Sequence, residues 1–88
     1  MRLDLFLKAS RLCPRRTVAQ KLCDAGLVSL NGAPAKSSHQ VKPADEIVIR
    51  RRDQVTRLRV LSVPQRNQVS KEEARDLYEL LSEELVEI

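Results

Sequence analysis

A change of hydrophobic period at Gly26 constrains the fold more than any other feature of this sequence. Before it, apolar residues recur at helical spacing, with Val18 and Leu22 four positions apart. After it, Val28 and Leu30 flank a polar serine, an alternation typical of a short, half-buried strand. Gly26 itself suits the left-handed residue that ends many helices. The sequence therefore predicts a helix that leads directly into a strand, and with it an α+β fold.

Two short helices are predicted before that glycine. The first covers residues 3–10, where apolar side chains recur at the i, i+3 and i+4 positions of one helical face. Pro14 suits the first turn of a helix, because that turn needs no intrahelical N–H donor. We therefore expect the second helix to run from about residue 14 to residue 25.

Strands are predicted over residues 28–30, 46–50 and 57–63, because apolar and polar side chains alternate in each segment. Asn31-Gly32 directly follows the first strand and is a strong hairpin signal, since both turn positions readily adopt a positive φ angle. Residues 51–53 are expected to form the turn between the second and third strands. The expected architecture is two helices packed on a small, mainly antiparallel sheet.

The last part of the chain, residues 67–88, is predicted to be an acidic helical extension of the domain formed by residues 1–66. Ser70 and Glu73 have the spacing of a helix capping box. Apolar residues then continue at helical spacing, namely Ala74, Leu77, Tyr78, Leu81 and Leu85. This amphipathic helix could pack on its own domain or on a partner. We expect the former, because a domain this small needs the buried area.

Charge is distributed unevenly along the 88 residues. Residues 1–66 hold 14 Lys/Arg against 5 Asp/Glu, a balance of +9, whereas residues 67–88 hold 2 against 7, a balance of −5. A body this basic indicates a nucleic-acid partner, and less strongly an anionic membrane surface. No apolar run is long enough to span a bilayer, so we expect a cytoplasmic protein without a membrane partner.

Six cations lie within the first 21 residues, against the single acid Asp4. They are Arg2, Lys8, Arg11, Arg15, Arg16 and Lys21. If the two helices pack by their apolar faces, these side chains share the outer surface, where they could bind phosphates. The alternative is an ordinary solvated helix face, and the charge asymmetry of the chain favours RNA binding. Asp4 is interpreted as a residue of the first helical turn or as the partner of a nearby arginine.

Nothing in the sequence indicates catalysis or a metal site. Cys13 and Cys23 are ten residues apart and His39 is the single histidine, so a zinc site would need other ligands. The cysteines are interpreted as reduced thiols with at least one in the core, and His39 as an exposed loop residue. No nucleophile–base pair, carboxylate pair or phosphate-binding glycine loop is present, so we expect no enzyme and no cofactor.

Two stretches carry a resemblance to a known family. "RLDLFLKASRL" followed by "RRTVAQKLCDAGLVSLNG" resembles the S4 RNA-binding domain, whose pattern has Arg-Leu-Asp, a basic second helix and Gly-x-Val-x-Val-Asn-Gly. "VKPADEIVI" is similar to the family's strand entry, but Ala44 stands where that pattern usually has glycine. The resemblance implies an S4-type (alpha-L) fold. It also implies that Arg2 and Arg16 contact the RNA of the large ribosomal subunit.

The resemblance extends over nearly the whole chain to small stand-alone bacterial members of the family that act in ribosome-associated quality control. It implies a monomeric factor that binds stalled large subunits carrying P-site peptidyl-tRNA. There it would stabilise the tRNA while an elongation partner adds a C-terminal alanine tail without mRNA. The alternative is a heat-shock-type factor that recycles free large subunits carrying nascent chains. The acidic C-terminal segment argues against the alternative, because those relatives usually have a longer basic extension.

Overall fold

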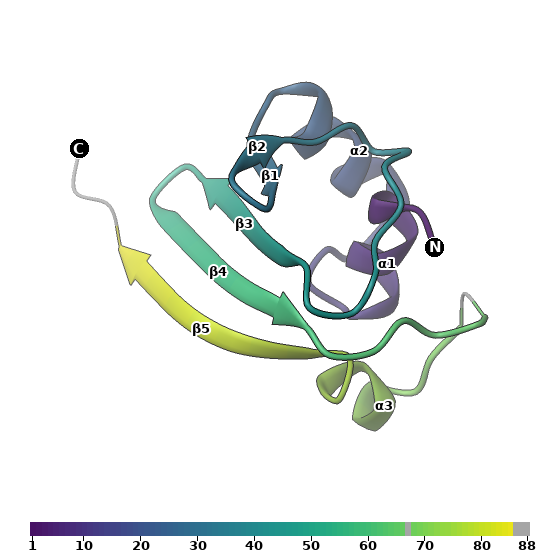
Figure 1. The fold of residues 1–88 in the computed structure, drawn as a ribbon. Coiled ribbons are helices and arrows are strands. Elements are labelled where there is room, and N and C mark those ends of the chain that lie inside the picture. The colour runs from purple at the N-terminus through teal and green to yellow at the C-terminus, as the bar shows by residue number, and fades with distance from the viewer. Residues whose placement is uncertain (67, 86–88) are drawn as a thin grey trace.

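The computed structural model of the chain describes residues 1–66 and 68–85, which form a helical layer packed on one twisted sheet (Figure 1). Its helices are α1 (Leu3–Ala9), α2 (Arg16–Asp24) and α3 (Lys71–Arg75). Its strands are β1 (Val28–Leu30), β2 (Ala33–Pro34), β3 (Glu46–Arg51), β4 (Gln54–Val60) and β5 (Tyr78–Leu85). Within these described residues, no helix has both the length and the apolar character needed to cross a membrane.

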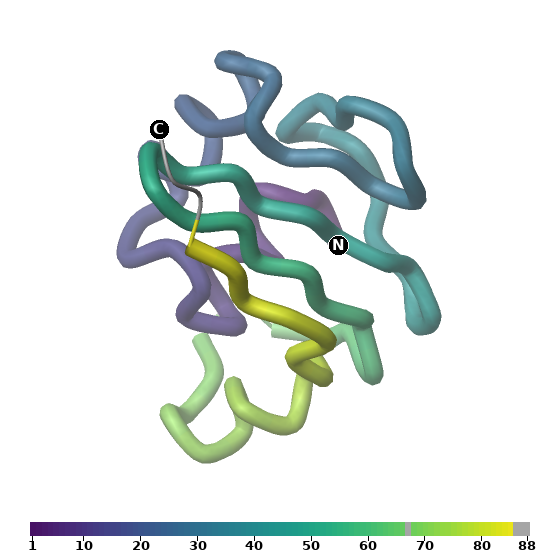
Figure 2. The backbone as a smooth tube through the Cα atoms, turned by 90° about the vertical axis from the view of Figure 1, so that its left-hand side faces the viewer, coloured from purple at the N-terminus to yellow at the C-terminus, as the bar shows by residue number. Residues whose placement is uncertain are grey.

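The sheet has the strand order β2-β1-β3-β4-β5, and every neighbouring pair is antiparallel. The predicted Asn31-Gly32 turn is confirmed: φ is 52° and 88° at the two residues, and Leu30 pairs with Ala33 on either side of them. In Figure 2 the strands lie in front and the helical layer is behind them. The predicted α+β architecture of two helices on an antiparallel sheet is therefore confirmed.

The core lies between α1 and the inner face of the sheet. Leu3, Phe6 and Leu7 of α1 are fully buried, as the helical spacing predicts, against a sheet face that includes Ile47 and Leu58. Burying large apolar side chains of this kind stabilises a fold by about 1.5–3 kcal/mol each. The N-terminal helix is thereby fixed on the sheet, and its first turn is held in a defined position.

The second helix differs from the prediction at its start and in its buried face. It begins at Arg16, because Arg15 is extended, with φ −143° and ψ 151°, so Pro14 lies in the connection and not in the first turn. Its most buried residues are Ala19 and Cys23, while Val18 and Leu22 are half-buried. Small side chains therefore occupy the most buried positions of α2.

The turn before β3 is left-handed even though it contains no glycine. Ala44 has a φ of 78°, and its N–H donates to the carbonyl of Val60 at 2.8 Å. Asp45, which is buried, closes the turn by accepting from the backbone of Lys42 at 3.0 Å and from the side chain of Asn31 at 3.1 Å. These hydrogen bonds hold alanine in a conformation that glycine adopts more easily.

The predicted C-terminal helix is wrong for most of its length. Ser70 is the N-cap, with its Oγ accepting from the N–H of Glu73 at 3.1 Å, but α3 ends at Arg75. Residues 78–85 form β5, which pairs with β4 over the whole of both strands. Pairing satisfies the backbone groups along β4, which an isolated helix would leave exposed at the sheet edge. The predicted extension also included residues 67 and 86–88, which lie outside the described residues.

The tail nevertheless packs on its own domain, as expected, with Ala74 and Leu77 buried. The third predicted strand is shifted relative to residues 57–63, since β4 starts at Gln54 and ends at Val60. The turn between β3 and β4 is correspondingly reduced to residues 52–53.

Candidate nucleic-acid interface

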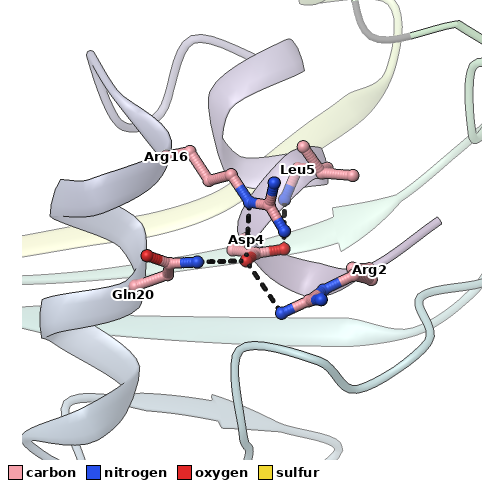
Figure 3. Close-up of polar contacts among 5 residues, drawn as sticks. All are labelled: Arg2, Asp4, Leu5, Arg16 and Gln20. Carbon is pink, nitrogen blue, oxygen red and sulfur yellow. Dashed lines mark hydrogen bonds and ion pairs between the residues drawn. The ribbon is translucent and has the colours of Figure 1, made fainter.

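The carboxylate of Asp4 is the centre of a polar network between α1 and α2 (Figure 3). Its Oδ2 accepts from Arg16 Nε at 3.0 Å, from Gln20 Nε2 at 3.0 Å and from a terminal nitrogen of Arg2 at 3.3 Å. Its Oδ1 accepts from the N–H of Leu5 at 2.8 Å. A single acid thus holds two guanidinium groups that are fourteen positions apart in the chain, Arg2 and Arg16.

The exposure of these groups is unequal. The Asp4 side chain is completely buried, whereas the side chains of Arg2 and Arg16 are 39% and 42% exposed. A guanidinium has five N–H donors, and Arg16 uses only Nε on Asp4. Its two terminal nitrogens therefore keep the forked geometry that matches two oxygens of a phosphate.

Local structure positions each member of this network. The first amides of α1 are satisfied by a loop, because the N–H groups of Leu3 and Asp4 donate to the carbonyls of His39 at 2.8 Å and Ser37 at 3.1 Å. On α2, Arg16 and Gln20 are one turn apart and therefore share the face that meets Asp4. The predicted role of Asp4 as the partner of a nearby arginine is confirmed, and the side chain of His39 is exposed, as expected.

The pKa of Asp4 reflects two opposing effects. Burial by itself raises the pKa of this carboxyl group. The hydrogen bonds from Arg16, Gln20 and the Leu5 backbone, together with the charge of Arg16, outweigh burial and hold the pKa below its usual value. Asp4 is therefore ionised at neutral pH and holds the two arginines by charge as well as by geometry.

A second pair of predicted cations lies at the end of α1. Lys8 and Arg11 are exposed and line an open groove of about 570 Å³, together with Ala9, Cys13, Pro14, Gln68 and Val69. Arg11 has a φ of 61° in the connection to α2, and its guanidinium donates to the carbonyl of Val69 at 3.3 Å. The groove thus joins the basic helical layer to the segment that precedes α3.

The remaining two predicted cations are not part of either group. Arg15 is exposed at the N-cap of α2, and Lys21 is exposed in its last turn. Lys21 follows Arg16 by five residues, which is about 140° further around the helix, so the two side chains leave from different faces. Within the helical layer, the six cations therefore form an organised pair, a groove pair and two separate charges.

Two polar residues that contact this region are not among the predicted site residues. Gln20 donates to Asp4, and its four-residue spacing from Arg16 was the available signal. Arg51, part of a basic run at residues 50–52, donates to the carbonyl of Leu12 in the connection between α1 and α2. That contact joins residues 39 positions apart and gave no local signal.

The two cysteines are buried, free thiols, as expected. Burial raises the pKa of Cys23 to about 11, and the negative charges of Asp4 and Asp24 raise it further. Burial also raises the pKa of Cys13, although the charge and hydrogen bond of Arg51 oppose it. Both thiols are therefore protonated at neutral pH, and a protonated thiol is a poor nucleophile and metal ligand.

Comparison with known proteins places this geometry in a family. The family model described as "S4 domain" matches residues 1–47, the segment that contains α1, α2 and the first hairpin. A Bacillus subtilis (strain 168) protein named "RQC P-site tRNA stabilizing factor" is 44% identical over 84 residues, covering 96% of this chain and 95% of its own. A Streptococcus pneumoniae protein of the same name is 41% identical over 87 residues, covering 99% and 97%.

Solved structures are similar over most of the chain. Heat Shock Protein 15 of Vibrio cholerae, described as trimeric, has a TM-score of 0.82 and 28% identity, covering 93% of this chain and 82% of its own. The hypothetical protein HP1423 has a TM-score of 0.81 and 30% identity, covering 93% and 98%. The family match, the relatives and the fold agree, and the chain belongs to the S4 domain family.

Proposed function

We propose that this chain is a non-catalytic RNA-binding factor of ribosome-associated quality control. In this proposal it binds large ribosomal subunits that carry peptidyl-tRNA after a stalled ribosome has split. It contacts the ribosomal RNA through α1 and α2 and stabilises the P-site tRNA. An elongation partner on the same subunit then adds a C-terminal alanine tail without mRNA. The factor acts in the cytoplasm as a monomer.

The observation that carries the proposal is the pair of arginines held by Asp4. Two guanidinium groups fixed on one buried carboxylate are preorganised for phosphate oxygens, so less side-chain entropy is lost on binding. Arginine supports such contacts better than lysine, because its planar fork matches a phosphate. The four other cations of the helical layer add sequence-independent attraction to the RNA backbone.

The relatives support the quality-control role of this RNA contact. Several bacterial relatives at about 40–45% identity over nearly the whole chain carry the name "RQC P-site tRNA stabilizing factor". A second candidate function is supported by the similarity to Heat Shock Protein 15, namely recycling of free large subunits that carry nascent chains. The acidic balance of residues 67–88 favours the first candidate, because a basic extension would be expected to add RNA contacts in the second.

The test is made in cells that lack this protein and express a reporter mRNA without a stop codon. The cells are complemented with the tagged wild type, Arg16→Ala or Arg57→Ala. Arg57 is an exposed arginine of β4, so its substitution removes the same charge away from the helical layer. RNA bound to each tagged protein is sequenced, and the C-terminus of the reporter is analysed by mass spectrometry.

We expect the wild type and Arg57→Ala to recover large-subunit RNA together with tRNA and to restore alanine tails. Arg16→Ala is expected to recover neither and to leave the reporter untailed. Large-subunit RNA without tRNA, combined with a reporter that is tailed in the absence of the protein, would support the recycling function instead. Recovery of messenger RNA alone would contradict both functions.

A further inference from the structure

Strand β5 leaves one edge of the sheet unpaired. It pairs with β4 on one side, and among residues 1–66 and 68–85 no strand pairs with its other side. Figure 2 shows this strand, in yellow, along one edge of the sheet, with the helical layer behind. An open edge presents backbone N–H and C=O groups to which another extended chain can add. The edge is therefore available to a partner.

The side chains of β5 combine exposed leucines with acids. Leu80, Leu81 and Leu85 are 50%, 37% and 79% exposed, although leucine is commonly buried. Three glutamates share the strand with them, namely Glu79, Glu83 and Glu84. The strand contains no lysine or arginine. Nearby α3 holds two acids, Glu72 and Glu73, and two bases, Lys71 and Arg75, so it adds no net negative charge.

Charge restricts what can bind to this edge. RNA is a polyanion, and Glu83 and Glu84 would repel it, whereas Glu79 lies 3.9 Å from Arg59 of β4. A second copy of the chain is also disfavoured, because pairing β5 with β5 would bring glutamates of both copies close together, and like charges across strands are destabilising. A basic partner is the one class whose charge complements this strand.

A purely protective role for the glutamates does not explain the leucines. Charged side chains on an edge strand commonly prevent aggregation. Three exposed leucines on the same strand would increase the tendency to aggregate, which the charges would reduce. Exposed apolar groups beside a polar rim are typical of interaction sites. The combination favours a partner that offers both apolar groups and positive charge.

We propose that the free edge of β5 binds an extended protein segment rich in lysine or arginine and interleaved with apolar residues. The segment adds to the sheet as a further strand next to β5. Its backbone pairs with the free N–H and C=O groups. Its cations lie near Glu79 and Glu84 on one face of the sheet, and its apolar side chains cover Leu80 and Leu85 on the other face, where Glu83 also lies. This site goes beyond RNA binding by α1 and α2 and does not depend on it.

The test uses the full-length protein, labelled with ¹⁵N, and nuclear magnetic resonance. The probe is a short synthetic peptide in which lysine and valine alternate. A control peptide has the same composition with all lysines at one end, so its charge is equal but it cannot present alternating faces. We expect the alternating peptide to shift the amide signals of residues 78–85 in a saturable manner and to slow their exchange with solvent. The control peptide should produce much smaller shifts.

Matched variants separate the edge from general acidity. Replacing Glu79, Glu83 and Glu84 together with glutamine should abolish the shifts. Replacing three acids elsewhere with their amides, Asp24→Asn, Glu46→Gln and Asp76→Asn, should leave most of the effect. The affected side chains are exposed, and the spectrum of each variant reports directly whether it is folded.

Five results would overturn the proposal. Equal shifts with both peptides, or shifts centred on α3, would mean that only charge attracts the peptide. No shift with the alternating peptide would mean that the edge does not bind such a segment. Shifts of residues 78–85 on addition of an RNA oligonucleotide would assign the edge to nucleic acid. Concentration-dependent broadening of β5 signals without any peptide would assign it to a second copy.

Discussion

The N-terminal helical layer and strand β5 carry opposite charges and hold them in different ways. In the helical layer, Arg2 and Arg16 are attached to a completely buried carboxylate at 3.3 and 3.0 Å. On β5, Glu79 approaches Arg59 at 3.9 Å, and both side chains are about half exposed. One region fixes its charged groups, whereas the other leaves them in solvent.

This difference indicates which charges have a defined geometry. An exposed ion pair contributes about 0–1 kcal/mol, since water screens it and both side chains lose freedom. Removing one partner of a buried carboxylate that has several donors lowers the free energy of unfolding far more, because the remaining groups stay desolvated. We therefore expect substitutions in the helical layer to affect both stability and RNA binding, and substitutions of the β5 pair to affect neither strongly.

The largest expected effect comes from Asp4→Asn. The amide cannot accept from all the donors around it, so we expect the free energy of unfolding to fall by about 2–3 kcal/mol. This is less than a fully buried ion pair would lose, because both arginines are partly exposed. Urea unfolding measures the change, and Asp53→Asn, an exposed acid in the β3–β4 turn, is the control. Equal stability of the two variants would refute the contrast between the regions.

The pH dependence of the unfolding free energy should distinguish the wild type from Asp4→Asn. Because the pKa of Asp4 in the folded state lies below its unfolded value, its ionised form stabilises the fold above about pH 4. This contribution is lost as the pH falls through the folded pKa. The difference in unfolding free energy between the wild type and Asp4→Asn should therefore shrink on acidification. A difference that stays constant from neutral pH to acid would mean that Asp4 is not held as a carboxylate.

A smaller effect on stability, but a large one on binding, is expected from Arg16→Ala. Loss of its bond to Asp4 should cost about 1–2 kcal/mol, near the lower end for bonds to charged groups. Binding to purified large subunits should weaken by at least about tenfold. The slope of log affinity against log salt concentration should become shallower by about one, the contribution of one phosphate contact. Arg16→Lys keeps the charge without the fork and should be intermediate. If Arg57→Ala weakens binding as much, the helical layer has no special role.

The smallest effect is expected where β5 meets β4. Arg59→Ala and Glu79→Ala should each change the unfolding free energy by less than about 1 kcal/mol, because the pair is exposed and long. A double-mutant cycle measured by urea unfolding isolates the pair itself. A coupling energy as large as that between Asp4 and Arg16 would remove the difference between the regions.

The elements that depend on local signals could be predicted from the sequence. The apolar spacing of α1, the glycine after α2 and the Asn31-Gly32 turn each act over a few residues, and all three appear in the structure. The start of α2 was misplaced, because Pro14 is compatible with both a first helical turn and the extended connection that it occupies.

Features that depend on distant partners could not be predicted. The apolar residues at 77, 78, 81 and 85 have helical spacing, but pairing with β4 decides in favour of a strand. The capping signal at Ser70 was real, yet it marks a helix of only five residues. At the site, the spacing of Arg16 and Gln20 indicates a shared face. That this face meets Asp4 follows only from the packing of α1 on α2.

The measurement that tests the central claim most directly is the RNA affinity of Asp4→Asn. If the helical layer attracted RNA by charge alone, removing a negative charge would tighten binding to large subunits. If Asp4 holds Arg2 and Arg16 in place for phosphate contacts, as we propose, binding should weaken despite the gain in net positive charge. Sedimentation with purified large subunits, at a temperature where the variant is folded, gives the sign of the change. Weaker binding is the predicted result, and equal or tighter binding would contradict the account.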